Sequence, residues 1–182
     1  MGGPRRAVGR RLAPVVDVAT SFAAERHGAL ADEIRSIARA HPEVSERSAR
    51  QLRRALRGRR LAVATDDGRV VGWFLSEPGA GGAHELGYLF VESRLRKGEI
   101  FDRMLAQLLE IDRHAVAVTF RPGFADWLQR SYGFERASLG RVIALSHGTF
   151  LLRRLSPVRL AAVARHTSEA APIYLTWTRP GL

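Results

Sequence analysis

The chain has 182 residues and a mass of 20.1 kDa, which is enough for one ordinary domain. Its composition, 46% hydrophobic and 26% charged, is that of a globular protein. The lack of cysteine excludes disulfides, thiolate nucleophiles and cysteine-based zinc sites. No apolar run approaches the length of a membrane span, so we expect a soluble cytoplasmic protein with no membrane partner.

The formal net charge is +11, and it is concentrated near the N-terminus. The first 60 residues carry 14 arginines against 6 acidic residues. A field of this sign concentrates anions of any kind, so a nucleic acid or an acidic partner is one hypothesis for these arginines, and plain solvated surface is the other. We expect residues 1–14 to form a flexible basic N-terminus ahead of a single domain over 15–182.

Two helices are predicted before residue 60. Apolar residues at three- and four-residue spacing favour a helix over 23–40, and His41-Pro42 ends it because the residue before proline avoids the helical region. Ser45 is the expected N-cap of the second helix. That helix has an apolar side and an arginine side, the latter made of Arg50, Arg53, Arg54 and Arg57.

Strands dominate the middle of the chain. Residues 61–65 and 70–75 form a predicted hairpin around Asp66-Asp67-Gly68-Arg69, and residues 78–82 form a loop before a strand over 84–91. The remaining predicted elements follow in order: a helix after Gly98, a strand over 115–120, a short helix ended by Gly133, and strands over 134–139 and 141–145. This order predicts a mixed α/β (α+β) sheet.

The last 35 residues, 148–182, read as an insertion or extension followed by a final strand. Ser156-Pro157 favours the start of a helix that reaches His166, and residues 173–178 are the predicted strand.

A basic turn links the strand over 84–91 to the next helix. The first amides of a helix have no partner within it, and with the helix dipole they favour a phosphate or pyrophosphate. Arg94, Arg96 and Lys97 add positive charge, and Gly98 permits close approach to the backbone. The turn therefore predicts an anion site.

Several of these segments together resemble the GNAT superfamily of acyl-CoA-dependent N-acyltransferases. The resemblance rests on Leu95-Arg-Lys-Gly-Glu-Ile100 before a Met/Leu-rich helix, and on the later segment Ala125-Asp-Trp-Leu-Gln-Arg-Ser-Tyr-Gly-Phe134. It covers roughly residues 15–145. It implies a mostly antiparallel sheet flanked by helices, with a V-shaped splay between the strands at 84–91 and 115–120. One departure is that Leu95 and Ile100 occupy the outer positions of the family's phosphate-loop pattern aligned on Gly98.

Acetyl-CoA or another acyl-CoA would then be the cosubstrate, lying in the splay. The resemblance implies that pantetheine pairs with backbone near Phe90 and Val91. It also implies that pyrophosphate is held by the backbone amides of Arg96, Lys97, Gly98, Glu99 and Ile100. No metal is expected.

The implied reaction is attack of a primary amine on the thioester, which needs a base and either an acid or water. By resemblance the base is Glu85, or its neighbour His84 if the strand register differs, since neighbours on a strand point to opposite faces. Gln129 stands where the family's tyrosine commonly sits, so Tyr132 or water is left as the acid. The amine substrate is not specified, and a homodimer is compatible with the sequence.

A different class of function is a nucleic-acid-binding protein, for example one that binds tRNA, with a degenerate acyl-CoA site. The two hypotheses merge in an acetyltransferase whose amine is carried on RNA.

Overall fold

The structure is a computed structural model that describes residues 16–41, 44, 46–95, 97–150 and 171–181. The predicted N-terminal segment 1–14, the predicted cap Ser45, the phosphate-loop residue Arg96 and the predicted helix over 156–166 lie outside the described residues.

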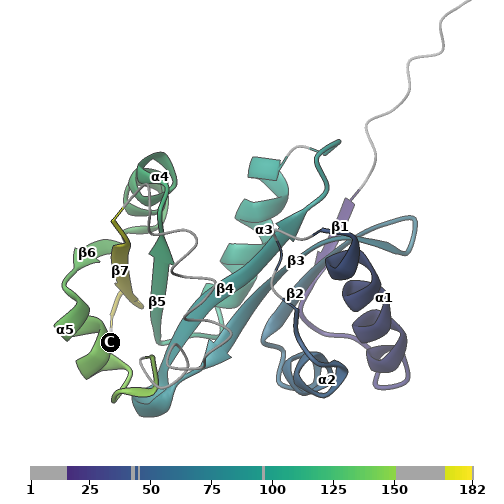
Figure 1. The fold of residues 1–182 in the computed structure, drawn as a ribbon, viewed down its shortest axis with the longest axis horizontal. Helices are drawn as coiled ribbons and strands as arrows, with labels where there is room; N and C mark the ends of the chain where they lie inside the picture. Colours follow the sequence, from purple (N-terminus) through teal and green to yellow (C-terminus); the bar gives the residue numbers. More distant parts are fainter. Residues whose placement is uncertain (1–15, 42–43, 45, 96, 151–170, 182) are drawn as a thin grey trace, which may run out of the picture.

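Within the described residues, seven strands form one sheet in the order β1-β2-β3-β4-β5-β7-β6. All neighbouring pairs are antiparallel except β4 and β5, which are parallel. The predicted mixed, mostly antiparallel sheet is therefore confirmed (Figure 1). The strands are β1 (Val16–Ala19), β2 (Leu61–Asp66), β3 (Arg69–Pro78), β4 (Ala83–Val91), β5 (His114–Thr119), β6 (Glu135–Ala137) and β7 (Ile173–Thr178).

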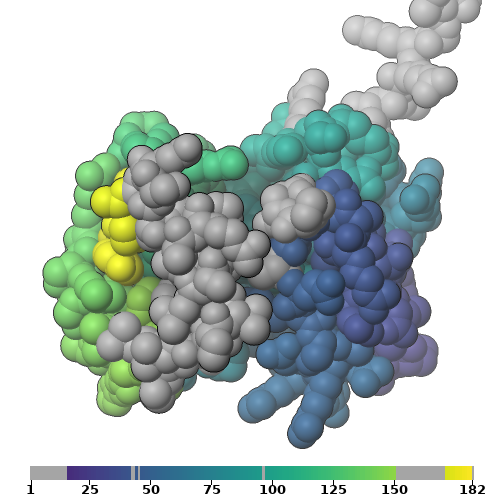
Figure 2. All heavy atoms as spheres, in the orientation of Figure 1, coloured from purple at the N-terminus to yellow at the C-terminus, as the bar shows by residue number. Residues whose placement is uncertain are grey.

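Helices cover both faces of the sheet. They are α1 (Arg26–Ala40), α2 (Ala49–Arg57), α3 (Lys97–Leu109), α4 (Pro122–Tyr132) and α5 (Leu139–Leu145), with a 3-10 turn η1 (Ala80–Gly82) between β3 and β4. One apolar core joins α1 and α2 to the sheet through residues such as Ile34, Leu52 and Trp73, and a second joins α3 and α4 to the other face through residues such as Met104 and Leu128. In Figure 2, α1 and α2 (blue) and α5 with β7 (green and yellow) lie toward opposite ends of the face shown.

Local sequence explains the beginnings and turns of these elements. Helix α2 starts after Ser48, whose side chain accepts from the Gln51 amide while Gln51 caps Ser48 in return, so the cap is three residues later than the predicted Ser45. The Asp67-Gly68 hairpin is confirmed: both residues have positive φ, 48° and 78°. Gly133 has the left-handed φ of 71° expected past the end of α4.

A β-bulge in β4 changes which side chains face α1 and α2. Trp73 pairs with Phe90 and Leu75 with Gly87, so β4 has one residue more than β3 over this stretch. Tyr88, within the bulge, has a φ of 54°. Glu85, before the bulge, lies on the α1/α2 face, and so do Tyr88, within the bulge, and Phe90, after it.

Two predictions near the C-terminus have different outcomes. The predicted strand over 141–145 is wrong: the segment is helix α5, because Ser138 caps it and Val142 packs on Val116 and Phe150. The predicted final strand is confirmed as β7, which lies between β5 and β6. The first strand, β1, was not predicted. None of the described helices is long and apolar enough to cross a bilayer.

Candidate active site

A groove opens where β4 and β5 separate. The two strands pair only from Ala83 and His114 to Leu86 and Ala117, and both continue beyond that point (Figure 1). The expected V-shaped splay is therefore present. The groove has a volume of about 780 Å³, within the range of small-molecule sites. Its lining comes from β4, α3, α4 and the α1–α2 connection: His41, Val44, Leu89, Phe90, Val91, Ser93, Lys97, Gly98, Phe101, Arg121, Gly123, Phe124 and Trp127.

The N-terminus of α3 meets this groove. Helix α3 begins at Lys97, and the amides of its first turn have no acceptor within the helix. A Cβ built on Gly98 has no atom within 4 Å, so the backbone there borders open space. The site can therefore present amide donors, the positive end of a helix and a lysine to an anion.

The predicted cofactor residues are distributed as follows. Phe90, Val91, Lys97 and Gly98 line the groove. The Ile100 side chain is buried in the α3 core, so only its backbone could serve a ligand, and Glu99 is exposed in the first turn of α3.

Nine groove residues were missed from the sequence, and they include Phe101, Arg121, Phe124 and Trp127. Phe124 and Trp127 are stacked, with ring centroids 5.8 Å apart, and Arg121 stands at the start of α4 directly after β5. Because β4 and β5 are parallel, their carboxyl ends meet at one edge of the sheet. The break Arg121-Pro122-Gly123 after a predicted strand was the signal available.

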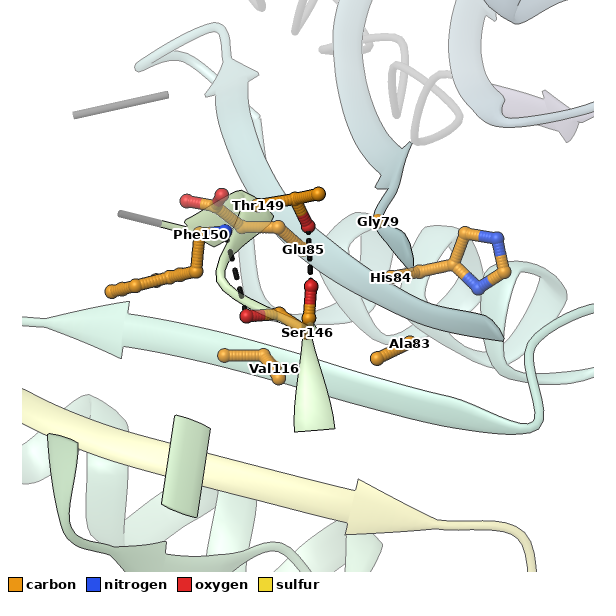
Figure 3. Close-up of a pocket in the computed structure, with 8 residues that line it drawn as sticks. All are labelled: Gly79, Ala83, His84, Glu85, Val116, Ser146, Thr149 and Phe150. Carbon is orange, nitrogen blue, oxygen red and sulfur yellow. Dashed lines mark hydrogen bonds between the residues drawn. The ribbon is translucent and has the colours of Figure 1, made fainter. Parts of the chain in front are cut away.

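Glu85 lies on the same face of the sheet as α1, α2 and α5. Its strand partners are Glu77 on β3 and Val116 on β5. A cavity of about 10 Å³, near the lower limit for one water, lies beside it between β4 and α5 (Figure 3). Thr149 and Phe150 line that cavity, and Thr149 donates to the Ser146 carbonyl oxygen at 2.7 Å.

His84 points away from Thr149 and Glu85 (Figure 3). Its Nδ1 is 3.2 Å from Oδ1 of Asp112, a fully buried carboxylate in the α3–β5 turn. Asp112 also accepts from the Ser76 hydroxyl at 2.6 Å and pairs with Arg60. Burial lowers the pKa of Arg60. His84 is thus part of a buried polar cluster at the closed end of the splay.

Tyr132 packs between α4 and α3. Its hydroxyl donates to Oδ1 of Asp102 at 2.7 Å and its ring contacts Trp127, and it is not among the groove-lining residues. Burial and the Asp102 carboxylate both raise the pKa of Tyr132.

A second polar group lies beside Glu85 on the α1/α2 face. Arg47, which precedes α2, donates from Nε to Oε1 of Glu77 at 3.2 Å, and both side chains are largely buried. The Arg47 guanidinium also lies 5.0 Å from the centroid of the Tyr88 ring. This group gathers residues from β3, β4 and the α1–α2 connection, none of which was predicted as functional.

Several solved structures with a similar fold are described as N-acetyltransferases or as proteins in complex with CoA. No family model and no curated protein matches the sequence. A Mycobacterium tuberculosis protein crystallised with CoA is similar over 91% of this chain and 99% of its own, with 15% identity and a TM-score of 0.57. Ribosomal-protein-alanine N-acetyltransferase from Brucella melitensis is similar over 91% and 99%, with 17% identity and a TM-score of 0.52.

N-acetylglutamate synthase from Neisseria gonorrhoeae, in a complex with CoA and N-acetylglutamate, is also similar, with 16% identity and a TM-score of 0.54. The match covers 90% of this chain but only 35% of that longer protein. The chain thus has the fold of the GNAT N-acyltransferases.

Proposed function

We propose that the protein transfers an acetyl or other acyl group from acyl-CoA to a primary amine. The observation that carries this is the groove between β4 and β5 with the α3 N-terminus, Lys97 and Gly98 at one end. Its volume suits a ligand of this size, and the open space at Gly98 suits close approach of a phosphate. The similar solved structures that hold CoA support the same ligand.

Within the groove, we assign the pyrophosphate to the first-turn amides of α3, those of Lys97, Gly98, Glu99 and Ile100. Arg96, which the sequence adds to this set, lies outside the described residues. The backbone of Phe90 and Val91, past the last β4–β5 pair, would meet the pantetheine arm. Bound acyl-CoA supplies an electrophilic thioester carbonyl.

Glu85 is our candidate for the general base. The amine nitrogen attacks the carbonyl carbon, its proton passes to the Glu85 carboxylate, and the carbon–sulfur bond breaks. Glu85 is preferred over His84 because it lies on the α1/α2 face, whereas His84 contacts Asp112 on the other side of β4. Since the Tyr132 proton is donated to Asp102, we assign protonation of the leaving thiolate to water in place of Tyr132.

Calorimetric titration with acetyl-CoA tests the proposal. We expect one binding site for acetyl-CoA per chain. We also expect acetyl-pantetheine, which lacks the diphosphate, to bind more weakly than acetyl-CoA. Equal affinity for the two would contradict the assignment of the α3 turn, and no binding of either would contradict the proposed function.

A second candidate function, polyanion binding, is favoured by the arginine side of α2. Arg50, Arg53, Arg54 and Arg57 are exposed at the spacing of one helix face, opposite buried Leu52 and Leu56. Among the described residues, no acidic side chain pairs with any of these four arginines, whereas Arg94, Arg136 and Arg141 each have a carboxylate partner. This side of α2, here called the arginine stripe, is the surface we assign to a nucleic acid.

A further inference from the structure

Three buried hydrogen-bond donors on the α1/α2 face have no partner within the described part of the chain. They are Nε of Arg35 on α1, Nε1 of Trp73 on β3 and the hydroxyl of Tyr88 on β4. Leaving such a group unpaired costs about 1–3 kcal/mol, so buried donors in folded proteins are nearly always satisfied by protein, water or ligand. Three on one face therefore point to something that binds there.

The three donors belong to one neighbourhood. The Tyr88 and Trp73 rings have centroids 5.5 Å apart, and Tyr88 is only 9% exposed. The charge of Arg35 acts on Tyr88 and lowers its pKa, as does that of Arg47, but burial outweighs both and raises the pKa of Tyr88 to about 12. The phenol therefore keeps its proton at neutral pH and remains a donor.

This neighbourhood adjoins Glu85. Because of the bulge, Glu85 and Tyr88 lie on the same face of β4, three residues apart. Their Cα atoms are therefore no more than about 10 Å apart, given the rise of an extended strand. The Glu85 carboxylate and the Tyr88 hydroxyl therefore belong to one face of the sheet.

We propose that Tyr88, with Arg35 and Trp73, forms the part of the acceptor site that binds an oxygen of the amine-bearing substrate. This rests on the proposed function, in which Glu85 receives the proton of the amine. The acceptor class is then an amine with a carboxylate or amide oxygen a few bonds away, an amino acid or a peptide, in preference to a bare alkylamine.

The chemistry of the donors selects oxygen. The guanidinium and indole N–H groups can only donate, and the protonated phenol is available to donate as well. A carboxylate or amide oxygen accepts such bonds, whereas an alkyl chain would leave all three donors unpaired. An acceptor that lacks the oxygen is therefore rejected by the cost of burying unpaired donors.

The test uses matched sets of three acceptors: an L-amino acid, the carboxamide of that amino acid, and the corresponding amine without the carboxyl group. Initial rates are followed by release of the CoA thiol, and binding of the same compounds to the full chain is measured by calorimetry, which needs no turnover. We expect the oxygen-bearing members to have KM values lower by roughly tenfold or more. The better of the acid and the amide identifies the oxygen as carboxylate or carbonyl.

Tyr88→Phe, which keeps the ring and removes the hydroxyl, should erase most of that preference. It should raise KM for the oxygen-bearing acceptors by roughly tenfold while kcat, acetyl-CoA affinity and the KM of bare amines change little. Tyr174→Phe on β7 is the matched control and should change none of these values.

Three results would overturn the proposal: equal use of bare amines, an equal effect of Tyr88→Phe on both members of a pair, or no binding of any oxygen-bearing compound. If amino acids bind and lose affinity in Tyr88→Phe while acetyl-CoA does not bind at all, the subsite stands and the proposed acyl transfer fails.

Discussion

At Gly98 an added side chain should be tolerated by the fold but should interfere with the proposed ligand. Because a Cβ there meets no protein atom, Gly98→Ala should fold normally, and alanine in a helix is generally more stable than glycine by about 0.5–1 kcal/mol. The added methyl would instead occupy the space where a phosphate approaches the α3 amides. We expect acetyl-CoA affinity, measured by calorimetry, to fall by roughly tenfold.

Gly28→Ala is the matched control for this prediction. Gly28 lies in α1, its Cβ also meets no atom within 4 Å, and it is outside the groove lining. It should retain full acetyl-CoA affinity. Equal affinities in the two variants would show that the α3 turn does not contact the ligand.

Glu85 and His84 are neighbours with separable roles. Glu85→Gln should reduce kcat by about 10²- to 10⁴-fold, the usual contribution of a general base, with acetyl-CoA affinity unchanged. His84→Gln should instead disturb the contact with Asp112, lower the free energy of unfolding by about 1–3 kcal/mol and leave kcat within a few-fold. Steady-state rates and urea unfolding of both variants check this, and the reverse pattern would make His84 the base.

The sequence could predict site residues that are local to one turn, and not those brought together by the sheet. Lys97 and Gly98 follow from a basic strand-to-helix turn, where the physics of a helix N-terminus is enough. Arg121 and Trp127 join them only because β4 and β5 run parallel. Which of Glu85 and His84 shares a face with Phe90 depends on the bulge at Tyr88, and no local sequence pattern predicts that bulge.

At the scale of elements, Asp112 connects two strands and two connecting segments. Its buried carboxylate contacts Arg60 before β2, Ser76 on β3 and His84 on β4, and it belongs to the α3–β5 turn. Asp112→Ala would leave a partly buried guanidinium without its partner. We expect the free energy of unfolding, measured in urea, to fall by about 3–5 kcal/mol.

Asp126→Ala provides the comparison for Asp112. Asp126 pairs with Arg136 at 3.0 Å, but both side chains are well exposed. Removing it should cost only about 0–1 kcal/mol. Similar losses in the two variants would mean that the buried cluster contributes no more than a surface pair.

Element types were predictable where the sequence pattern matched the final neighbours. The Asp67-Gly68 hairpin and β7 are examples. The segment 141–145 is apolar and β-branched, which favoured a strand, but β7 occupies the place beside β5, and the Ser138 cap and the packing of Val142 stabilise a helix instead. Its type was therefore decided partly by residues more than 25 positions away, Val116 and those of β7.

At the scale of the whole molecule, the arginine stripe predicts salt-sensitive binding. For a single-stranded RNA probe that meets all four arginines, the logarithm of affinity should fall against the logarithm of salt concentration with a slope of about −3. Replacing the four by glutamine should flatten that slope in fluorescence anisotropy titrations and leave acetyl-CoA affinity unchanged.

The control replaces arginines that already have carboxylate partners, Arg94, Arg136 and Arg141, and should change the slope little. If the two sets of replacements weaken RNA binding equally, the effect comes from net charge alone, and the arginine stripe is not a specific binding surface.

The short pairing between β4 and β5 divides the sheet into two leaves. Among the described strands, only the stretch from Ala83 to Leu86 holds β1–β4 to the β5–β7–β6 leaf directly, and the Asp112 cluster lies at that same seam. A molecule in the groove would contact residues on both sides of it and would restrain the motion of the two parts of the sheet relative to each other. We therefore expect ligand binding to slow amide exchange in β5 and β7, far beyond the residues it contacts.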